Sequence, residues 1–406
     1  MNESLWLDEA TTALVSRMSL GEIFTKFLPG DFHPPLYYLF MKYWVSIFGS
    51  SEIFLRLPSV IFALLTVYVV YRLSGKIAAM LLATAPLLFY YAQEARMYSL
   101  ITLLVSYLVY SFIKKKWLNF SITLALLGLT DYVALLIIPI FWIIGWRGRR
   151  KLLISHLPLV VSYLFWFPIF SKQFMSGMGV GAAWSAILGE ASFKNFLLIP
   201  VKFMIGRVGF DEKWLYGVIV AGTAGLYAYL LFKARKANKI YWLWLTVPIV
   251  LGAFLSFKIS ILTYFRFLFV LPAFYILVAL GIEATGRFKN LFLTLVLCIN
   301  LLSIGYYLLT PRFHREDWRG AAGAIGGSKI VFPANSQKEA LIYYGKGNQI
   351  ISSDEIDKKD KEIWLSRYVW EVFDSEDTAR MKIEDLGYNK TSEHNFNGVL
   401  FWKYTL

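Results

Sequence analysis

The stretch EIFLRLPSVIFALLTVYVVYRL at residues 52–73 decides the fold class, because it is long and apolar enough to cross a lipid bilayer as one helix. The chain of 406 residues is 57% apolar and 18% aromatic, with a mean hydropathy of +0.54. Apolar runs continue beyond the first one, at about 77–92, 97–113, 117–130, 132–146, 152–170, 214–232, 240–257, 262–282 and 290–309. Together they predict a polytopic α-helical membrane protein with about ten transmembrane helices.

Basic residues between the runs predict the orientation in the membrane. Five basic clusters fall at every second connection: Arg72 with Lys76, Lys114 to Lys116, Arg147 to Lys151, Lys233 to Lys239, and Arg287 with Lys289. Because cytoplasmic connections are rich in Lys and Arg, these connections are expected in the cytoplasm and both chain ends outside it. The formal net charge of +14 is therefore a topology signal, and no nucleic-acid partner is expected. The single cysteine, Cys298, lies in an apolar run and excludes a disulfide framework.

Three domains are expected along the chain. Residues 1–51 form an extracytoplasmic loop with two interfacial helices, Leu5 to Met18 and Leu36 to Phe48. Residues 52–310 form the transmembrane domain, which includes an external loop at 171–213. Residues 311–406 form a small extracytoplasmic α/β domain, with helices near 316–325, 336–344 and 375–386 and strands near 329–332, 349–352, 362–367 and 389–404.

Two adjacent carboxylates, Asp8 and Glu9, mark the first interfacial helix. Its apolar stripe is expected at Leu7, Ala10, Leu14 and Met18, with Asp8 on a polar face. Consecutive helical residues point about 100° apart, so the two carboxylates cannot serve one substrate atom equally. A partly desolvated Asp8 suits general-base catalysis, whereas Glu9 would bind an acceptor or a cation. The alternative is that both simply occupy a first helical turn, where the helix dipole favours them.

The segment Asp-Phe-His-Pro-Pro-Leu-Tyr-Tyr at 31–38 carries the second candidate group. His33, beside Asp31, is a candidate to contact a phosphate or to hold a divalent metal, although one histidine makes a dedicated zinc site a weak hypothesis. The alternative is that the proline pair only marks the start of the following helix and has no role in binding.

Charged residues close to the apolar runs form the third group. If residues 90–98 are helical, Tyr90, Glu94 and Tyr98 share one face and Arg96 lies on the next. An ionisable residue in such a place is a functional hypothesis by default, against the alternative of a surface ion pair. Arg266, flanked by apolar residues, suits an anionic headgroup or phosphate, and snorkelling is its alternative. Asp131 is expected to form a turn.

Five motifs in order carry a resemblance to a known family. They are Leu-Trp-Leu-Asp-Glu-Ala at 5–10, Asp-Phe-His-Pro-Pro-Leu-Tyr-Tyr at 31–38, Gly-Ser-Ser-Glu-Ile-Phe-Leu-Arg-Leu-Pro-Ser at 49–59, Tyr-Ala-Gln-Glu-Ala-Arg-Met-Tyr at 91–98, and Arg-Glu-Asp-Trp-Arg-Gly-Ala-Ala at 315–322. With them the chain resembles the GT-C membrane glycosyltransferases. The nearest group is the family 39-like branch related to protein O-mannosyltransferases and the lipid A aminoarabinose transferase.

The resemblance implies an inverting, mannosyltransferase-like enzyme that takes a sugar from a polyprenyl-phosphate donor and gives it to a protein, lipid or glycan acceptor outside the membrane. The Asp-Glu motif falls on Asp8, as the catalytic base, and Glu9. A lipid-phosphate leaving group needs cations, for which Arg96 and Arg266 are the first candidates and Lys202 and Arg207 the weaker ones. The candidate substrate-binding residues are His33, Tyr37, Glu94 and Tyr98.

Two other functions fit the same composition. A lipid or solute transporter would place ionisable residues near the bilayer midplane, whereas the residues here cluster at the ends of the runs. A non-catalytic assembly protein would act through residues 311–406. Members of the family have a transmembrane helix before the Asp-Glu loop, so a further upstream helix is expected.

Overall fold

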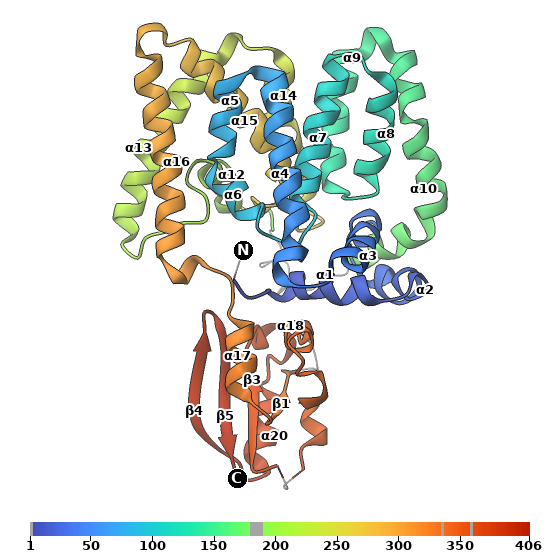
Figure 1. Ribbon diagram of the computed structural model, residues 1–406, viewed down its shortest axis with the longest axis vertical. Coiled ribbons are helices and arrows are strands. Elements are labelled where there is room, and N and C mark those ends of the chain that lie inside the picture. Colours follow the sequence, from blue (N-terminus) through green and yellow to red (C-terminus); the bar gives the residue numbers. More distant parts are fainter. Residues whose placement is uncertain (1–2, 179–189, 334–336, 358–359) are drawn as a thin grey trace. The chain divides into compact units, whose positions relative to one another are not determined.

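The computed structural model describes residues 3–178, 190–333, 337–357 and 360–406 (Figure 1). The chain folds as two compact units. The first unit consists of residues 1–18, 41–55 and 310–406, and the second of residues 19–40 and 56–309.

The second unit is helical. Its longer helices, two of which begin or end in the first unit, are α3 (Leu36–Phe48), α4 (Glu52–Ser74), α5 (Lys76–Ala83), α6 (Pro86–Tyr91), α7 (Tyr98–Ile113), α8 (Trp117–Gly128), α9 (Ile138–Gly145), α10 (Arg149–Met178), α12 (Phe193–Ile205), α13 (Lys213–Lys233), α14 (Lys239–Leu255), α15 (Leu271–Glu283) and α16 (Lys289–Leu309). Short turns connect them: α2 (Leu20–Glu22), a π-helix (Ile23–Phe27), and 3-10 helices at Leu28–Gly30, Val133–Ile137, Trp146–Gly148, Ala234–Lys236, Leu268–Val270 and Gly286–Phe288.

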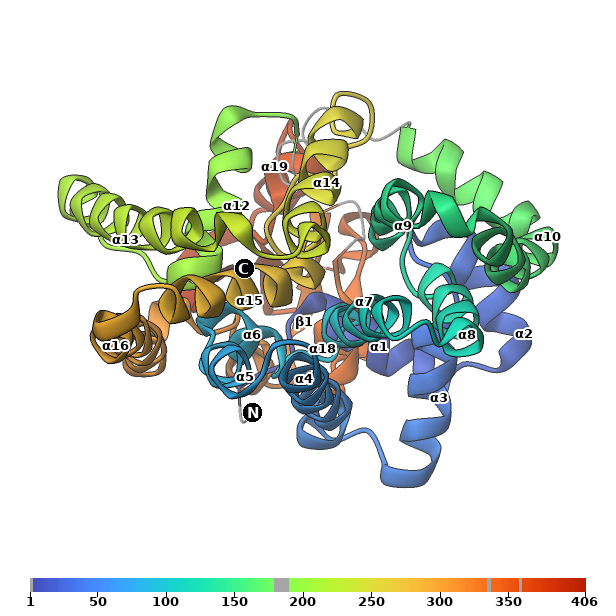
Figure 2. The ribbon, with the colours of Figure 1, turned by 90° about the horizontal axis from the view of Figure 1, so that it is seen from above.

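Helix α15 lies at the centre of one group of helices. It is apolar on all sides and almost wholly buried, because α5, α13 and α14 pack around it (Figure 2). Gly281 permits this close packing, since a Cβ atom there would lie 2.0 Å from the carbonyl oxygen of Leu230 in α13. Another group is built on α8, which packs against α7 and α10.

Among the described residues, four segments are long and apolar enough to cross a membrane: Glu52–Ser74, Val133–Ser176, Lys213–Lys236 and Gly286–Leu309. Shorter apolar helices lie at Tyr98–Ile113, Trp117–Gly128, Lys239–Leu255 and Leu268–Glu283. The mainly helical, apolar architecture of a membrane protein is therefore confirmed, while the number of about ten spans stays a prediction.

Three of the predicted helical runs have different boundaries in the structure. The run 77–92 is divided into α5 and α6, because Pro86 cannot donate a backbone hydrogen bond and starts a new helix. The run 262–282 becomes α-helical only from Leu271, after a 3-10 turn. The run 152–170 extends to Met178 as α10, so the predicted external loop 171–213 begins inside a helix. Residues 179–189 of that loop lie outside the described residues, and its later part contains α12.

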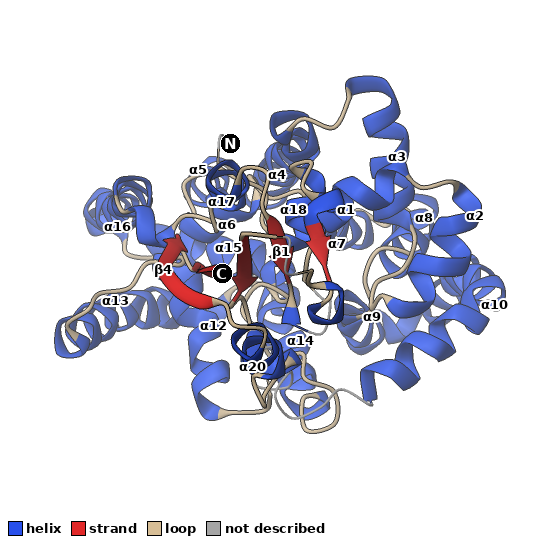
Figure 3. Cartoon of the chain, turned by 90° about the horizontal axis from the view of Figure 1, so that it is seen from below, coloured by secondary structure: helices blue, strands red, loops and turns tan. Residues whose placement is uncertain are grey.

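The first unit contains a five-stranded sheet in the order β2-β1-β3-β5-β4 (Figure 3). Strand β1 is parallel to β2 and β3, whereas β5 is antiparallel to β3 and β4. The bounds are β1 (Lys329–Val331), β2 (Ile350–Ile351), β3 (Glu362–Ser366), β4 (Asn389–Phe396) and β5 (Val399–Thr405), with helices α1 (Leu7–Arg17), α17 (Trp318–Ile325), α18 (Glu339–Tyr343), α19 (Trp370–Phe373) and α20 (Thr378–Asp385) and 3-10 turns at Pro311–Phe313, Gly347–Gln349 and Ser353–Glu355.

Alternating strand residues cover the two faces of this sheet. One face packs against α17 and α18 through Ile330, Trp364 and Phe401, and Ala10 of α1 joins this cluster. The other face packs against α20 through Val331, Ile363 and Leu365. The result is a three-layer α/β arrangement within residues 311–406, with the predicted order of helices and strands apart from the short helix α19, which was not predicted.

Candidate active site

The first candidate group lies in the first turn of α1, within the first unit. Asp8 is half-buried, whereas the side chain of its neighbour Glu9 is completely buried. The expected stripe of Leu7, Ala10, Leu14 and Met18 is wrong in part: Ala10 is buried, but the other three keep some exposure. The buried side of α1 is mixed and carries the polar residues Glu9, Thr12 and Ser16 beside Ala10, Ala13 and Val15.

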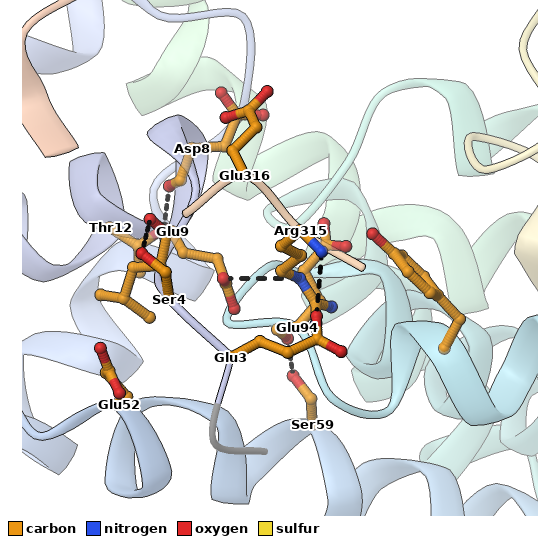
Figure 4. Close-up of polar contacts among 12 residues, drawn as sticks. Glu3, Ser4, Asp8, Glu9, Thr12, Glu52, Ser59, Glu94, Arg315 and Glu316 are labelled. Atoms are coloured by element: carbon orange, nitrogen blue, oxygen red, sulfur yellow. Dashed lines mark hydrogen bonds and ion pairs between the residues drawn. The ribbon is translucent and has the colours of Figure 1, made fainter. Parts of the chain in front are cut away.

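The buried carboxylate of Glu9 lies beside Arg315, which follows the last long helix. Glu9 Oε2 is 3.6 Å from Arg315 Nε, and the Arg315 side chain is 3% exposed. A second carboxylate, that of Glu3, accepts hydrogen bonds from the backbone nitrogen of Arg315 at 3.1 Å and from its Nη1 at 3.3 Å. Figure 4 shows Arg315 between these two carboxylates. Glu9 is thus a buried, charge-paired residue.

Glu316 and Tyr368 form a second polar group in the same unit. Glu316 accepts hydrogen bonds from the Tyr368 hydroxyl at 2.7 Å and from Trp318 Nε1 at 2.8 Å. Burial raises the pKa of Tyr368, and the carboxylates of Glu316 and Asp8 raise it further. The Tyr368 phenol therefore lies within electrostatic reach of Asp8. Sequence reasoning gave no sign of Tyr368, and it quoted Glu316 in a motif without a role.

The segment 31–38 belongs to the second unit. His33 Nδ1 lies 3.4 Å from an Asp31 carboxylate oxygen, with side-chain exposures of 18% and 16%. Burial alone would raise the pKa of Asp31. The charge and hydrogen bond of His33 outweigh this effect, together with the charge of Arg96 and a hydrogen bond from Tyr38, and lower the pKa of Asp31 to about 2. Asp31 is therefore ionised at neutral pH. Tyr37, in the next helical turn, is fully buried.

One amide side chain holds the loop that carries Asp31 and His33. Gln173, near the end of α10 and 2% exposed, donates from Nε2 to the carbonyl oxygens of Leu28 at 2.6 Å and His33 at 3.1 Å. Its Oε1 accepts a hydrogen bond from the Tyr132 hydroxyl at 2.5 Å, and that hydroxyl accepts one from Trp166 Nε1 at 2.8 Å. Sequence reasoning placed Gln173 in an external loop and gave it no role.

The predicted turn at Asp131 is confirmed. Asp131 Oδ1 accepts a hydrogen bond from the backbone nitrogen of Ala134 at 2.8 Å, and the side chain is 8% exposed. Burial raises the pKa of Asp131, while the charges of His33 and Arg266 oppose the rise. His33 thus interacts electrostatically with two carboxylates, those of Asp31 and Asp131.

Residues 90–98 are not one helix, so Tyr90, Glu94 and Tyr98 do not share a helical face. Helix α6 ends at Tyr91, residues 92–97 form turns, and α7 begins at Tyr98. The carbonyl oxygen of Glu94 accepts hydrogen bonds from the Ser59 hydroxyl at 2.5 Å and from the backbone nitrogen of Arg96 at 2.8 Å, which stabilises the turn. Glu94, Arg96 and Tyr98 are all buried, so the alternative of a surface ion pair does not hold.

The remaining cationic candidates also lie in the second unit. Arg266 Nη1 donates to the Ser260 carbonyl oxygen at 2.7 Å. Arg207 stacks over the Tyr90 ring, 4.4 Å from its centre, and donates to the Tyr90 hydroxyl. Lys202 Nζ donates to the Val208 carbonyl oxygen at 3.2 Å; burial and the charge of Arg207 lower the pKa of Lys202 to about 8.

The described residues around His33 do not form a closed zinc site, and a divalent metal there stays a prediction. Across the described ranges, no three His, Cys, Asp or Glu side chains come together as metal ligands. His33 and Asp31 would supply two ligands, whereas a closed zinc site takes four.

Comparison with known proteins gives a likeness in fold. No protein-family profile and no curated protein sequence matches the chain. Two crystal structures of ArnT from Cupriavidus metallidurans do match. The apo structure has a TM-score of 0.57 and 12% sequence identity, and covers 99% of this chain and 94% of that one. The structure bound to undecaprenyl phosphate has a TM-score of 0.55 and 13% identity, with the same coverage.

The likeness extends over nearly the whole chain and shows the fold: a mainly helical chain with strongly apolar helices and a small C-terminal sheet, as in the ArnT structures. Both of these similar structures are of ArnT. The GT-C resemblance indicated by the five sequence motifs is thereby confirmed at the level of the fold.

Proposed function

We propose that the protein is an inverting glycosyltransferase that moves a sugar from a polyprenyl-phosphate donor to an acceptor on the outer face of the membrane. The observation that carries the proposal is the likeness in fold over 99% of the chain to an ArnT structure with bound undecaprenyl phosphate. A polyprenyl phosphate is the leaving group of such a reaction. The five motifs, matched independently of the structure, support the same enzyme class.

The chemistry needs one base and a set of cations. An acceptor hydroxyl or amine attacks the anomeric carbon, the bond from that carbon to the phosphate oxygen breaks, and the polyprenyl phosphate leaves with the electron pair. Inversion follows from this single displacement. Asp8 takes the proton of the acceptor, a task that suits a half-buried carboxylate in a first helical turn.

The leaving phosphate gains negative charge as the bond breaks, so cations stabilise the transition state. Arg96 and Arg266 are proposed for this role. Lys202 and Arg207 are proposed as further donor contacts, because they are neighbouring cations and a bound phosphate would relieve their mutual repulsion. We propose that His33, Tyr37, Glu94 and Tyr98 contact the sugar or the acceptor.

A transfer assay tests the proposal. Purified protein in lipid nanodiscs is incubated with undecaprenyl-phosphate-linked sugars and a panel of protein, lipid and glycan acceptors, and mass spectrometry measures the glycosylated product and the released undecaprenyl phosphate. Replacing Asp8→Asn is expected to lower kcat by roughly 100- to 10,000-fold, the usual contribution of a general base. Asp354→Asn, at an exposed carboxylate of the same unit, is the matched control.

Wild-type turnover in the Asp8→Asn protein would remove Asp8 as the base. A wild-type protein that binds undecaprenyl phosphate but forms no product with any donor would point to the transporter or assembly alternatives.

A further inference from the structure

The two carboxylates of the Asp-Glu motif differ in what they can reach. Glu9 has 0% exposed surface, whereas Asp8 keeps part of its surface open. The Glu9 carboxylate is engaged by Arg315 inside the first unit and is not presented to an acceptor or a donor. The role of Glu9 therefore has to come from the residues that bury it.

Those residues come from the segment that leads into the α/β domain. Arg315 Nε lies 3.6 Å from Glu9 Oε2, and Glu3 binds the same arginine through two hydrogen bonds. A buried ion pair adds little net stability, but removal of one partner is costly because the other charge stays buried without compensation. The pair consequently fixes geometry more than it raises stability.

A second set of contacts in the same unit holds the chain on either side of this pair. The backbone nitrogen of Arg319 donates to the Ser4 hydroxyl at 3.0 Å, and the Arg319 side chain pairs with Glu52. The Tyr344 hydroxyl donates to Glu52 at 2.5 Å and accepts from the backbone nitrogen of Leu5 at 2.8 Å. Residues 3–9 are thus attached to the domain by both backbone and side-chain contacts.

Fixing one side chain of a helix fixes the direction of its neighbour. Successive helical side chains project about 100° apart, so an anchored Glu9 sets the rotation of α1 about its axis and with it the direction of Asp8. Ala10, the next residue, packs into the domain core and leaves little freedom for rotation.

We propose that Glu9 and Arg315 are a positioning pair for Asp8, and that Glu9 takes no part in the chemistry. This inference rests on the proposed function, in which Asp8 is the base. It gives a role to the Arg-Glu-Asp-Trp-Arg segment at 315–319: this segment holds the catalytic helix.

A set of charge changes at the two positions tests the inference in the nanodisc transfer assay. Glu9→Gln and Arg315→Met each remove one charge and should lower kcat by about 100-fold, the scale for a misplacement of roughly 1 Å, with little change in KM for the undecaprenyl-phosphate sugar. The double change Glu9→Gln with Arg315→Met removes both charges of the buried Glu9–Arg315 pair, so neither is left buried without the other, while Glu3 is 23% exposed and reaches solvent. The double variant should therefore recover at least tenfold of that loss. Glu393→Gln, in an exposed ion pair with Lys390, is the matched control for the Glu→Gln change and should leave kcat unaltered.

Two kinetic outcomes would overturn the proposal. If the double variant is as slow as Glu9→Gln alone, the Glu9 carboxylate acts in the chemistry itself. If the single variants lower the thermal unfolding temperature but keep kcat per folded molecule, the pair is only structural.

Hydrogen exchange measures the same pair without turnover. In Glu9→Gln, amide exchange should increase within residues 7–17 and 315–319 and not in α20, and the double variant should restore protection. Unchanged exchange in residues 7–17 would also overturn the proposal. Asp8→Asn should leave this exchange unaltered. A protein that transfers no sugar, or whose Asp8→Asn variant stays active, would therefore contradict the proposed function while the exchange result still decides on the positioning pair.

Discussion

The Gln173 amide offers the sharpest test of how the second unit is held together. Its Nε2 donates to the carbonyl oxygens of Leu28 and His33, and its Oε1 accepts from the Tyr132 hydroxyl. Replacing Gln173→Met keeps the length and approximate volume of the side chain and removes all three hydrogen bonds. At a net value of about 1 kcal/mol each, the expected loss is about 3 kcal/mol in the free energy of unfolding.

Thermal unfolding followed by tryptophan fluorescence in detergent measures this loss. For a unit of this size, about 3 kcal/mol corresponds to roughly 6 °C in Tm. Tyr132→Phe removes the hydroxyl, and with it the hydrogen bonds to Gln173 and from Trp166, and should cost about 2 kcal/mol. The double variant should cost less than the sum of the two single variants, because both remove the same hydrogen bond.

Gln173→Glu adds a check on the donor role. At neutral pH the introduced carboxylate faces two carbonyl oxygens and cannot donate, so this variant should be less stable than Gln173→Met. The unfavourable contacts raise the pKa of the introduced carboxyl in the folded state, so its folded state binds more protons and its stability rises as the pH falls. The reasoning is refuted if Gln173→Met changes Tm no more than Tyr132→Phe, or if Gln173→Glu matches the wild type at pH 7.

Two further predictions concern the proposed donor site and the orientation. The pKa of Lys202 is lowered to about 8, so the lysine loses its charge above that pH. Undecaprenyl phosphate should therefore bind about tenfold more weakly at pH 9.5 than at pH 7, and Lys202→Arg should remove most of this pH dependence. An equal pH dependence in both proteins would exclude Lys202 from the site. For the orientation, Glu376→Cys in a Cys298→Ser background introduces a single cysteine at an exposed position, which should react with an impermeant maleimide in intact cells. Labelling that occurs only after lysis would place the α/β domain on the cytoplasmic side.

Local patterns predicted much of the fold. The order of helices and strands in residues 311–406 followed from alternation and turn residues, and α3 was predicted with its observed bounds. The division of the run 77–92 was also signalled locally, by Pro86, although the apolar pattern concealed it. Apolar periodicity alone does not distinguish one long helix from two short ones.

Contacts between distant residues account for what the sequence did not show. The burial of Glu9 depends on Arg315, which lies far along the chain, so no pattern around position 9 could reveal it. The turn at 92–97 is stabilised by a hydroxyl of α4, that of Ser59, and the loop at 28–33 by Gln173 of α10. Such hydrogen bonds leave no periodic pattern in the sequence, so the sequence did not decide whether residues 90–98 are helical.

The first unit combines segments from both ends of the chain, residues 1–18, 41–55 and 310–406, so it cannot be completed until late in synthesis on the ribosome. All segments of the second unit exist once residue 309 has been made. The helix that carries Asp8 emerges among the first, yet the arginine that pairs with Glu9 emerges about 300 residues later. Throughout that interval Arg315 is not yet available to Glu3 and Glu9. The helix bearing the proposed base is therefore completed only when translation reaches the last quarter of the chain.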